Sequence, residues 1–132
     1  MPADNTRPII TTLLVTADMS AEETFQNSTL RPIIKMKHDL FIDYLLDYLA
    51  AKKNPLSSLG REKGILYLES VFQQDRNLRS ELRGVVLSHL TTEEYHQYVD
   101  IKSEMNKRII NIIKNRMVDH IDLLSQGRLA SV

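Results

Sequence analysis

Residues 30–49 read LRPIIKMKHDLFIDYLLDYL, and their apolar side chains return every three or four positions. That spacing places them on one side of an α-helix, which turns once in about 3.6 residues. The apolar positions are Leu30, Ile33, Ile34, Leu40, Phe41, Tyr44, Leu45, Tyr48 and Leu49. The stretch therefore predicts an amphipathic helix that buries one face and runs to about Lys53, just before Asn54-Pro55.

On the N-terminal side, Ser20 and Glu23 have the form of a capping box and predict a short helix to about Asn27. Pro32 has no N–H and crowds the carbonyl four residues earlier, so a straight continuation is not expected. Two alternatives stay open. Either Ser28 or Thr29 caps a new helix that has Pro32 in its first turn, or a single helix is kinked at Pro32.

On the C-terminal side, apolar residues keep helical spacing as far as Leu124. We expect helices from Ser57 or Ser58 to about Asp75, over residues 76–90, and over residues 91–125. Thr91 and Glu94 form a second capping box, and Gly127 suits a C-terminal stop. The last helix would have about thirty residues and be some 45 Å long. That length favours either the centre of a bundle or a contact with another subunit.

The chain of 132 residues has the length of a single domain. Pro2, Pro8 and the β-branched run at 9–15 predict that residues 1–19 form an extended arm. The arm would lie on the helices or contribute to a subunit interface. Residues 20–126 are predicted to form an all-α bundle of four or five helices, and residues 127–132 a C-terminal tail.

Seventeen basic residues oppose seventeen acidic ones, so the formal net charge is zero. A general attraction to nucleic acid or to anionic lipid is therefore not expected. The chain has no cysteine, which excludes disulfides and thiolate metal sites. The apolar run at 9–15 is too short to span a membrane and lacks the pattern of a signal peptide. We expect a cytoplasmic protein without a membrane partner.

Three stretches resemble a known family: FQNSTLRPIIK at 25–35, LRGVVLSHLTTEEY at 82–95 and NKRII at 106–110. The arrangement is similar to that of a small family of bacterial proteins of about this length, to which no function is assigned. Some members carry the label glyoxalase. Glyoxalase enzymes use repeated βαβββ units with metal ligands on strands, and no comparable strands are predicted here. The resemblance therefore implies a family and no chemistry.

Two groups of residues have the spacing of metal ligands. Asp39, Asp43 and Asp47 share one face of a helix, but that face lies opposite the apolar side, so we interpret it as solvated. Glu93 and His96 have the spacing that carboxylate-bridged di-iron bundles use twice, and no second Glu-x-x-His occurs in the chain. We therefore predict no metal and no cofactor.

An anion site is the more specific prediction. A helix N-terminus offers unpaired backbone N–H groups to an anion, and basic residues stand near the one predicted at Thr91. The candidate ligand-binding residues are Arg83, His89, Thr91, Thr92 and His96. The helix needs Thr91 as its cap in any case. His38 also adjoins an apolar face, and we interpret it as a hydrogen-bonded boundary residue.

No glycine-rich phosphate loop, nucleophile elbow or metalloprotease helix motif occurs in the sequence. We therefore expect a non-catalytic helical interaction protein that forms a homodimer and binds an unidentified protein partner. The alternative is a small-ligand or anion-binding protein, or an enzyme, with its site where the helix over 76–90 meets the helix over 91–125. Nucleic-acid binding by the basic last helix is the weakest hypothesis, because acidic residues interleave with the basic ones.

Overall fold

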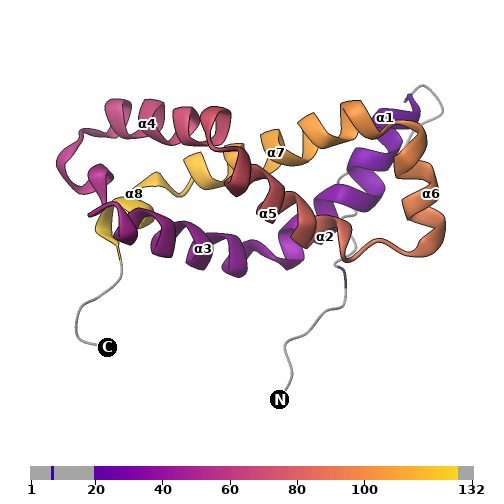
Figure 1. The fold of residues 1–132 in the computed structure, drawn as a ribbon, viewed down its shortest axis with the longest axis horizontal. Coiled ribbons are helices and arrows are strands. Elements are labelled where there is room, and N and C mark those ends of the chain that lie inside the picture. The colour runs from indigo at the N-terminus through magenta and orange to yellow at the C-terminus, as the bar shows by residue number, and fades with distance from the viewer. Residues whose placement is uncertain (1–6, 8–19, 128–132) are drawn as a thin grey trace, which may run out of the picture.

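The structure is a computed structural model, and it describes residue 7 and residues 20–127. These residues form no strand, which confirms the all-α prediction (Figure 1). The elements in order are α1 (Ala21–Phe25), the π-helical segment η1 (Gln26–Leu30), α2 (Arg31–Met36), α3 (His38–Ala51), the 3₁₀ segment η2 (Pro55–Ser58), α4 (Arg61–Gln74), α5 (Arg76–Leu87), α6 (Thr92–Asp100), α7 (Lys102–Val118) and α8 (Ile121–Gln126).

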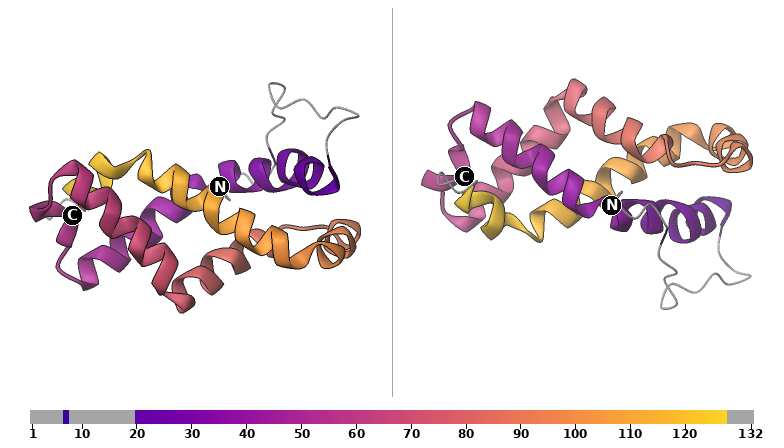
Figure 2. Two further views of the ribbon diagram at one scale, coloured as in Figure 1. Left: turned by 90° about the horizontal axis from the view of Figure 1, so that it is seen from above. Right: turned by 90° about the horizontal axis from the view of Figure 1, so that it is seen from below.

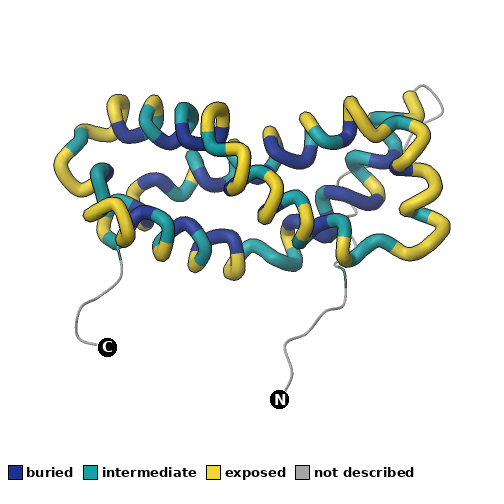
Figure 3. The backbone as a smooth tube through the Cα atoms, viewed as in Figure 1, coloured by how far each residue is buried: buried dark blue, intermediate teal, exposed yellow. Residues whose placement is uncertain are grey.

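The molecule is elongated, with α3, α4 and α8 gathered at one end and α1 and α6 at the other (Figures 1 and 2). Helix α7 joins the two ends and contacts η1 and the helices α2, α3, α4, α5 and α6. Its buried residues are Met105, Ile109, Ile110, Ile113 and Met117. The buried positions of the surrounding helices face the same interior (Figure 3). The hydrophobic core therefore forms around α7.

The single long helix predicted over 91–125 is wrong, because the chain turns twice within that range. The helix stops at Ile101, where φ is −127° and ψ is 28°, and again at Asp119 and His120. At Ile101 the backbone N–H bonds the carbonyl three residues back, which tightens the turn and ends α6. Across that break, the Tyr98 hydroxyl donates to Asn106 Oδ1 at 2.5 Å. The breaks allow α8 to fold back against α3 and α4.

Around Pro32 the chain stays helical from Ala21 to Met36, which is closer to the single-helix alternative. The π-helical segment η1 widens the helix just before the proline, with the Arg31 N–H donating to the Gln26 carbonyl. A wider turn makes room for the proline ring, which would otherwise clash with the preceding turn. The predicted helix from residue 30 to residue 53 is instead divided at Lys37, where φ is −100° and ψ is 15°.

Helix α4 begins at Arg61, after Gly60, and not at Ser57 or Ser58 as predicted. Residues 55–58 form the 3₁₀ segment η2 instead, directly after Asn54-Pro55. This correction has a local reason. Asn54 takes a left-handed conformation with φ 41°, and this turns the chain before a helix can begin.

Side-chain caps fix where three other helices begin. Ser20 Oγ accepts the Glu23 N–H at 3.1 Å, and Asp75 Oδ1 accepts the Leu78 N–H at 3.0 Å. The capping box predicted at Thr91 is confirmed, with both of its hydrogen bonds present. The backbone of Thr91 is extended, as a capping residue requires, so the chain must leave the helical conformation before it. For this reason α5 ends at Leu87 and not near residue 90 as predicted.

The predicted arm over residues 1–19 lies outside the described residues except for Arg7, and so does the predicted tail after Gly127. Gly127 itself ends α8 with φ 71°, as its place in the sequence predicts. Among the helices of residues 20–127, none combines the length and the apolar content needed to cross a membrane.

Asn54→Ala should lower the free energy of unfolding by about 1–3 kcal/mol. The Asn54 Nδ2 donates to the carbonyls of Leu124 and Ser125 at 3.4 and 3.3 Å, so alanine leaves the end of α8 uncapped at an unfavourable φ. Urea denaturation followed by circular dichroism measures the change. Asn54→Gly loses the same hydrogen bonds without the backbone strain and should be milder. Equal stability of wild type and Asn54→Ala would contradict this role.

Candidate anion-binding site

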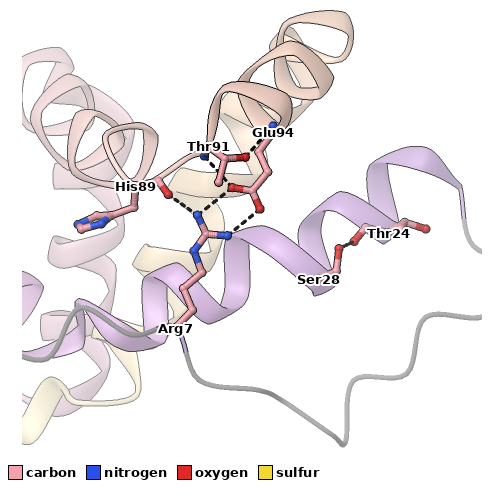
Figure 4. A network of polar contacts seen from close by, with 6 residues as sticks. All are labelled: Arg7, Thr24, Ser28, His89, Thr91 and Glu94. Atoms are coloured by element: carbon pink, nitrogen blue, oxygen red, sulfur yellow. Dashed lines mark hydrogen bonds and ion pairs between the residues drawn. The ribbon is translucent and has the colours of Figure 1, made fainter.

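The N-terminus of α6, where the sequence predicts an anion site, is held by the protein's own carboxylate. Glu94 Oε1 accepts the Thr91 backbone N–H at 2.8 Å, and Thr91 Oγ1 accepts the Glu94 N–H at 3.1 Å (Figure 4). The carboxylate also lies in the first turn, where the helix dipole favours negative charge. A negative group therefore already occupies this helix end.

Arg7 completes the network and joins the N-terminal region to the start of α6. Its Nη1 and Nη2 donate to the two oxygens of Glu94 at 2.7 and 2.8 Å, and Nη2 also donates to the His89 carbonyl (Figure 4). The hydrogen bond from Arg7, burial and the Thr91 N–H act on the carboxyl group, and their net effect lowers the pKa of Glu94. The guanidinium thus neutralises the carboxylate and ties the turn after α5 to α6.

The other predicted site residues divide between this junction and a separate place. The His89 ring is half-buried, and burial followed by the charges of Lys37 and Arg7 lowers its pKa. Thr92 and His96 are exposed on α6, and the His96 ring lies against Tyr95 with centroids 6.2 Å apart. His89 and Thr91 therefore share one network. Arg83 belongs to none of its hydrogen bonds.

Arg83 lies instead in a cleft between α4, α5 and α7, with a volume of about 300 Å³. Arg79 comes from the same helix, one turn earlier, and Lys107 comes from α7. The remaining lining residues are the amides Gln73, Asn106 and Asn111 and the apolar Phe72 and Ile110. We call this group of eight residues the basic cleft.

The basic cleft concentrates positive charge without a matching carboxylate. Its three cations are Arg79, Arg83 and Lys107, and no acidic residue lines it. Among the residues that the structure describes, none of the three forms an ion pair. Arg79 instead donates to the carbonyls of Phe72 and Gln73 at 3.1 and 2.5 Å. The carbonyls at the end of α4 therefore provide hydrogen-bond acceptors for Arg79. They carry no net charge, so the positive charge of Arg79 remains unbalanced at the cleft.

Arg83 differs from Arg79 in a way that bears on ligand binding. Its Nε is enclosed by the protein and has no hydrogen-bond acceptor in the described part of the chain. A buried N–H without an acceptor costs about 1–3 kcal/mol. Such a group is uncommon in native structures and calls for a partner.

A second hollow continues the basic cleft along α4 and α7. It has a volume of about 420 Å³ and shares Phe72, Gln73, Ile110 and Asn111 with the basic cleft. At its far end stand Glu69 and Lys114, one acid and one base. The basic cleft and this hollow together form one surface. Its charge is positive at the Arg83 end, and at the other end the charges of Glu69 and Lys114 cancel.

The two groups with metal spacing lie on exposed helix faces in the part of the chain that the structure describes. Asp39, Asp43 and Asp47 are exposed on α3, and Glu93 and His96 are exposed on α6. Within residues 20–127 and Arg7, no three histidine or acidic side chains come close enough together to hold a metal ion. The exposure of all three aspartates is what a solvated face predicts.

Comparison with protein-family models, with curated proteins and with solved structures gave no match to this chain. The family resemblance drawn from the sequence therefore stays a prediction, and the argument for function depends on the geometry described above.

The sequence places Arg83 with His89, Thr91, Thr92 and His96, whereas the structure brings it together with Arg79 and Lys107, which the prediction did not include, and it adds Arg7 to the network of Thr91. Arg79 carries a detectable signal, because it precedes Arg83 by four positions and so shares a helix face with it. Arg7 carries none, because its partner Glu94 lies 87 positions away in the sequence.

Arg7→Met should lower the free energy of unfolding by roughly 1 kcal/mol at pH 7, because it removes a bidentate, partly buried ion pair. The folded protein lowers the pKa of Glu94, so this stabilisation is fully present above the ordinary glutamate pKa of 4.5. It is lost as the pH falls through the lowered value. Urea denaturation of both proteins between pH 7 and pH 3 measures it. Arg61→Met, which breaks an exposed pair with Asp122, should change stability less. A difference independent of pH would contradict the assignment.

Proposed function

We propose that the protein binds a small anionic ligand in the basic cleft, with Arg83 as its main contact. The observation that carries this proposal is the convergence of Arg79, Arg83 and Lys107 on a cleft that no acidic residue lines; of the three, Arg83 also has an enclosed Nε without an acceptor among the described residues. This is the anion-binding alternative drawn from the sequence, moved from the start of α6 to the cleft beside α7.

A structural role explains Arg79 better than it explains Arg83. An arginine that serves packing alone normally finds backbone carbonyls, as Arg79 does at the end of α4. Arg83 keeps a costly unpaired donor beside two other cations. An anion in the cleft would accept from the Nη groups of Arg83 and offset the repulsion among the three charges. A planar guanidinium also suits the paired oxygens of phosphate, sulfate and carboxylate groups.

The lining residues favour binding over catalysis. They offer guanidinium, ammonium and amide donors, and none of the eight is a histidine, a serine or an acid that could act as nucleophile or general base. A volume of about 300 Å³ accommodates a small ligand and lies at the lower end of ligand pockets generally. Phosphate and small phosphorylated or carboxylated compounds are the ligand class that fits.

At pH 7.5, phosphate or a small phosphorylated compound should raise the unfolding temperature of the wild type. A ligand at 100 times its dissociation constant adds about 2.7 kcal/mol to stability. Arg83→Met should weaken binding roughly 10- to 100-fold, because a hydrogen bond to a charged group contributes about 1.5–3 kcal/mol. Calorimetric titration measures the affinity. Arg76→Met, on the same helix but outside the basic cleft, should bind as the wild type does.

The same Arg83→Met variant distinguishes a functional from a structural arginine. Without ligand, its free energy of unfolding should equal that of the wild type or exceed it by up to about 1 kcal/mol, because methionine leaves no unpaired donor. A large loss of stability would show that Arg83 serves the fold. Equal ligand affinity in both proteins would dispose of the proposal.

Self-association is the second candidate function, and the surface of α6 favours it. Tyr95 and Val99 stand four positions apart on one helix face and are 48% and 45% exposed. Such exposed apolar neighbours are typical of contact surfaces. A homodimer or an interaction with another protein through α6 would leave the basic cleft open, so the two candidates are compatible.

Light scattering across a concentration series tests self-association. If α6 forms the contact, the wild type should show dimer mass at tens of micromolar, and Val99→Glu should show monomer mass. The matched control is Leu66→Glu on α4, which is also exposed and should not change the mass. A wild-type protein that stays monomeric throughout removes this candidate.

A further inference from the structure

Two histidines and an arginine meet where α3, α7 and α8 come together, away from the residues of the basic cleft. The rings of His38 and His120 lie with centroids 4.6 Å apart. Arg116 Nη1 is 3.3 Å from His38 Nδ1, and His120 Nδ1 is 2.8 Å from the Arg116 carbonyl oxygen. We call His38, His120 and Arg116 the histidine cluster.

These contacts fix the protonation states of the histidine cluster. A guanidinium is always protonated, so Arg116 must be the donor and His38 Nδ1 must be an acceptor without a proton. His120 Nδ1 faces a carbonyl oxygen and must therefore carry the proton that it donates. In this arrangement His38 is neutral.

A hollow of about 270 Å³ adjoins the cluster and carries further positive charge. Arg116 and His120 line it together with Arg31, Ile112, Asn115 and Asp119. Arg31 donates from Nε to Asn27 Oδ1 at 3.2 Å. Neither Arg31 nor Arg116 forms an ion pair with a carboxylate of the described residues. The acidic groups that face the cluster are Asp119, in the hollow, and Asp39, beside His38.

We propose that this hollow is a second anion site, in which a small dianion such as sulfate or phosphate binds together with a proton on His38, the ring that accepts from Arg116. The site shares no residue with the basic cleft, so the inference does not depend on the function proposed above. It would make anion binding at this end of the molecule respond to pH.

The geometry gives the reason for the coupling. When His38 takes up a proton on Nδ1, that atom becomes a donor and can no longer accept from Arg116. The Arg116 guanidinium then loses the acceptor that His38 supplied and stands beside the His38 imidazolium and Arg31. An anion in the hollow would accept from Arg116 and oppose these three positive charges, which among the described residues face the carboxylates of Asp119 and Asp39.

Without an anion, protonation of the cluster is unfavourable. Burial, then the charges of His120 and Arg116, lowers the pKa of His38, and Asp39 opposes them only in part. The neutral form is therefore favoured in the folded protein, and stability should fall as the pH drops below the ordinary histidine value of 6.5. A bound dianion would remove this penalty, because an opposite charge within about 4–6 Å favours the protonated imidazole.

Nuclear magnetic resonance of the imidazole groups tests the proposal residue by residue. The Arg83→Met protein is titrated from pH 8 to pH 5 in sodium sulfate and, separately, in sodium chloride of the same ionic strength. Sulfate should raise the pKa of His38 by roughly 0.5 or more. By linkage, 0.5 corresponds to about threefold tighter sulfate binding when His38 is protonated. His89 is the internal control and should titrate alike in both salts.

Three variants separate a site in the hollow from general screening. Arg116→Gln and Arg31→Gln should each abolish or halve the response to sulfate, and Asp119→Asn should increase it because a repelling carboxylate is removed. Circular dichroism and the unchanged titration of His89 report that each variant is folded. The proposal is overturned if sulfate and chloride give the same titration. It is also overturned if the response persists in both arginine variants, because the anion would then bind elsewhere.

Discussion

The burial of one face of α7 is the constraint on which the rest of the structure depends. Met105, Ile109, Ile113 and Met117 are completely buried, and a fully buried side chain of this kind contributes about 1.5–3 kcal/mol. Several helices pack against α7. The polar side chains of α7 that lie between its buried residues therefore reach the surface along the lines of contact with α4, α5 and α3. Both proposed sites lie on such lines of contact. Lys107 reaches one of them, and Arg116 reaches the other.

The pairing of charges separates structural cations from candidate ligand contacts. In a chain with zero net charge, every cation has a possible counter-ion, and Arg7, Arg61 and Arg108 each have one, with N–O distances of 2.7–2.9 Å. Among the described residues Arg83 and Arg116 form no ion pair, although both are partly buried, where an unbalanced charge is less well solvated than at the surface. This lack of a counter-ion is the physical basis for proposing that they bind anions.

The sequence predicted what burial and capping determine, and it missed what long-range contacts determine. Apolar periodicity identified the helices, but a break at Ile101 alters one residue's dihedral angles without interrupting that periodicity, so the last helix looked continuous. Arg83 was grouped with His89 because they are close in sequence. The two residues are six positions apart, but α5 ends at Leu87, so Arg83 lies on the helix while His89 lies in the turn that follows it. Only the packed structure shows that α7 lies on the Arg83 side.

The directions of the basic residues of α7 decide between a polyanion and small separate anions as ligands. This helix carries five basic residues and one acidic residue, which from sequence alone resembles a surface for nucleic acid. A long polyanion needs such charges along one continuous groove. Arg108 instead turns to Glu104 and Gln26, Lys107 lines the basic cleft, and Arg116 turns to His38. Lys107 and Lys114 lie along the continuous surface of the basic cleft and its neighbouring hollow, whereas Arg108 and Arg116 do not, so the charges of α7 are divided between surfaces, which favours the proposed small anions over one long polyanion.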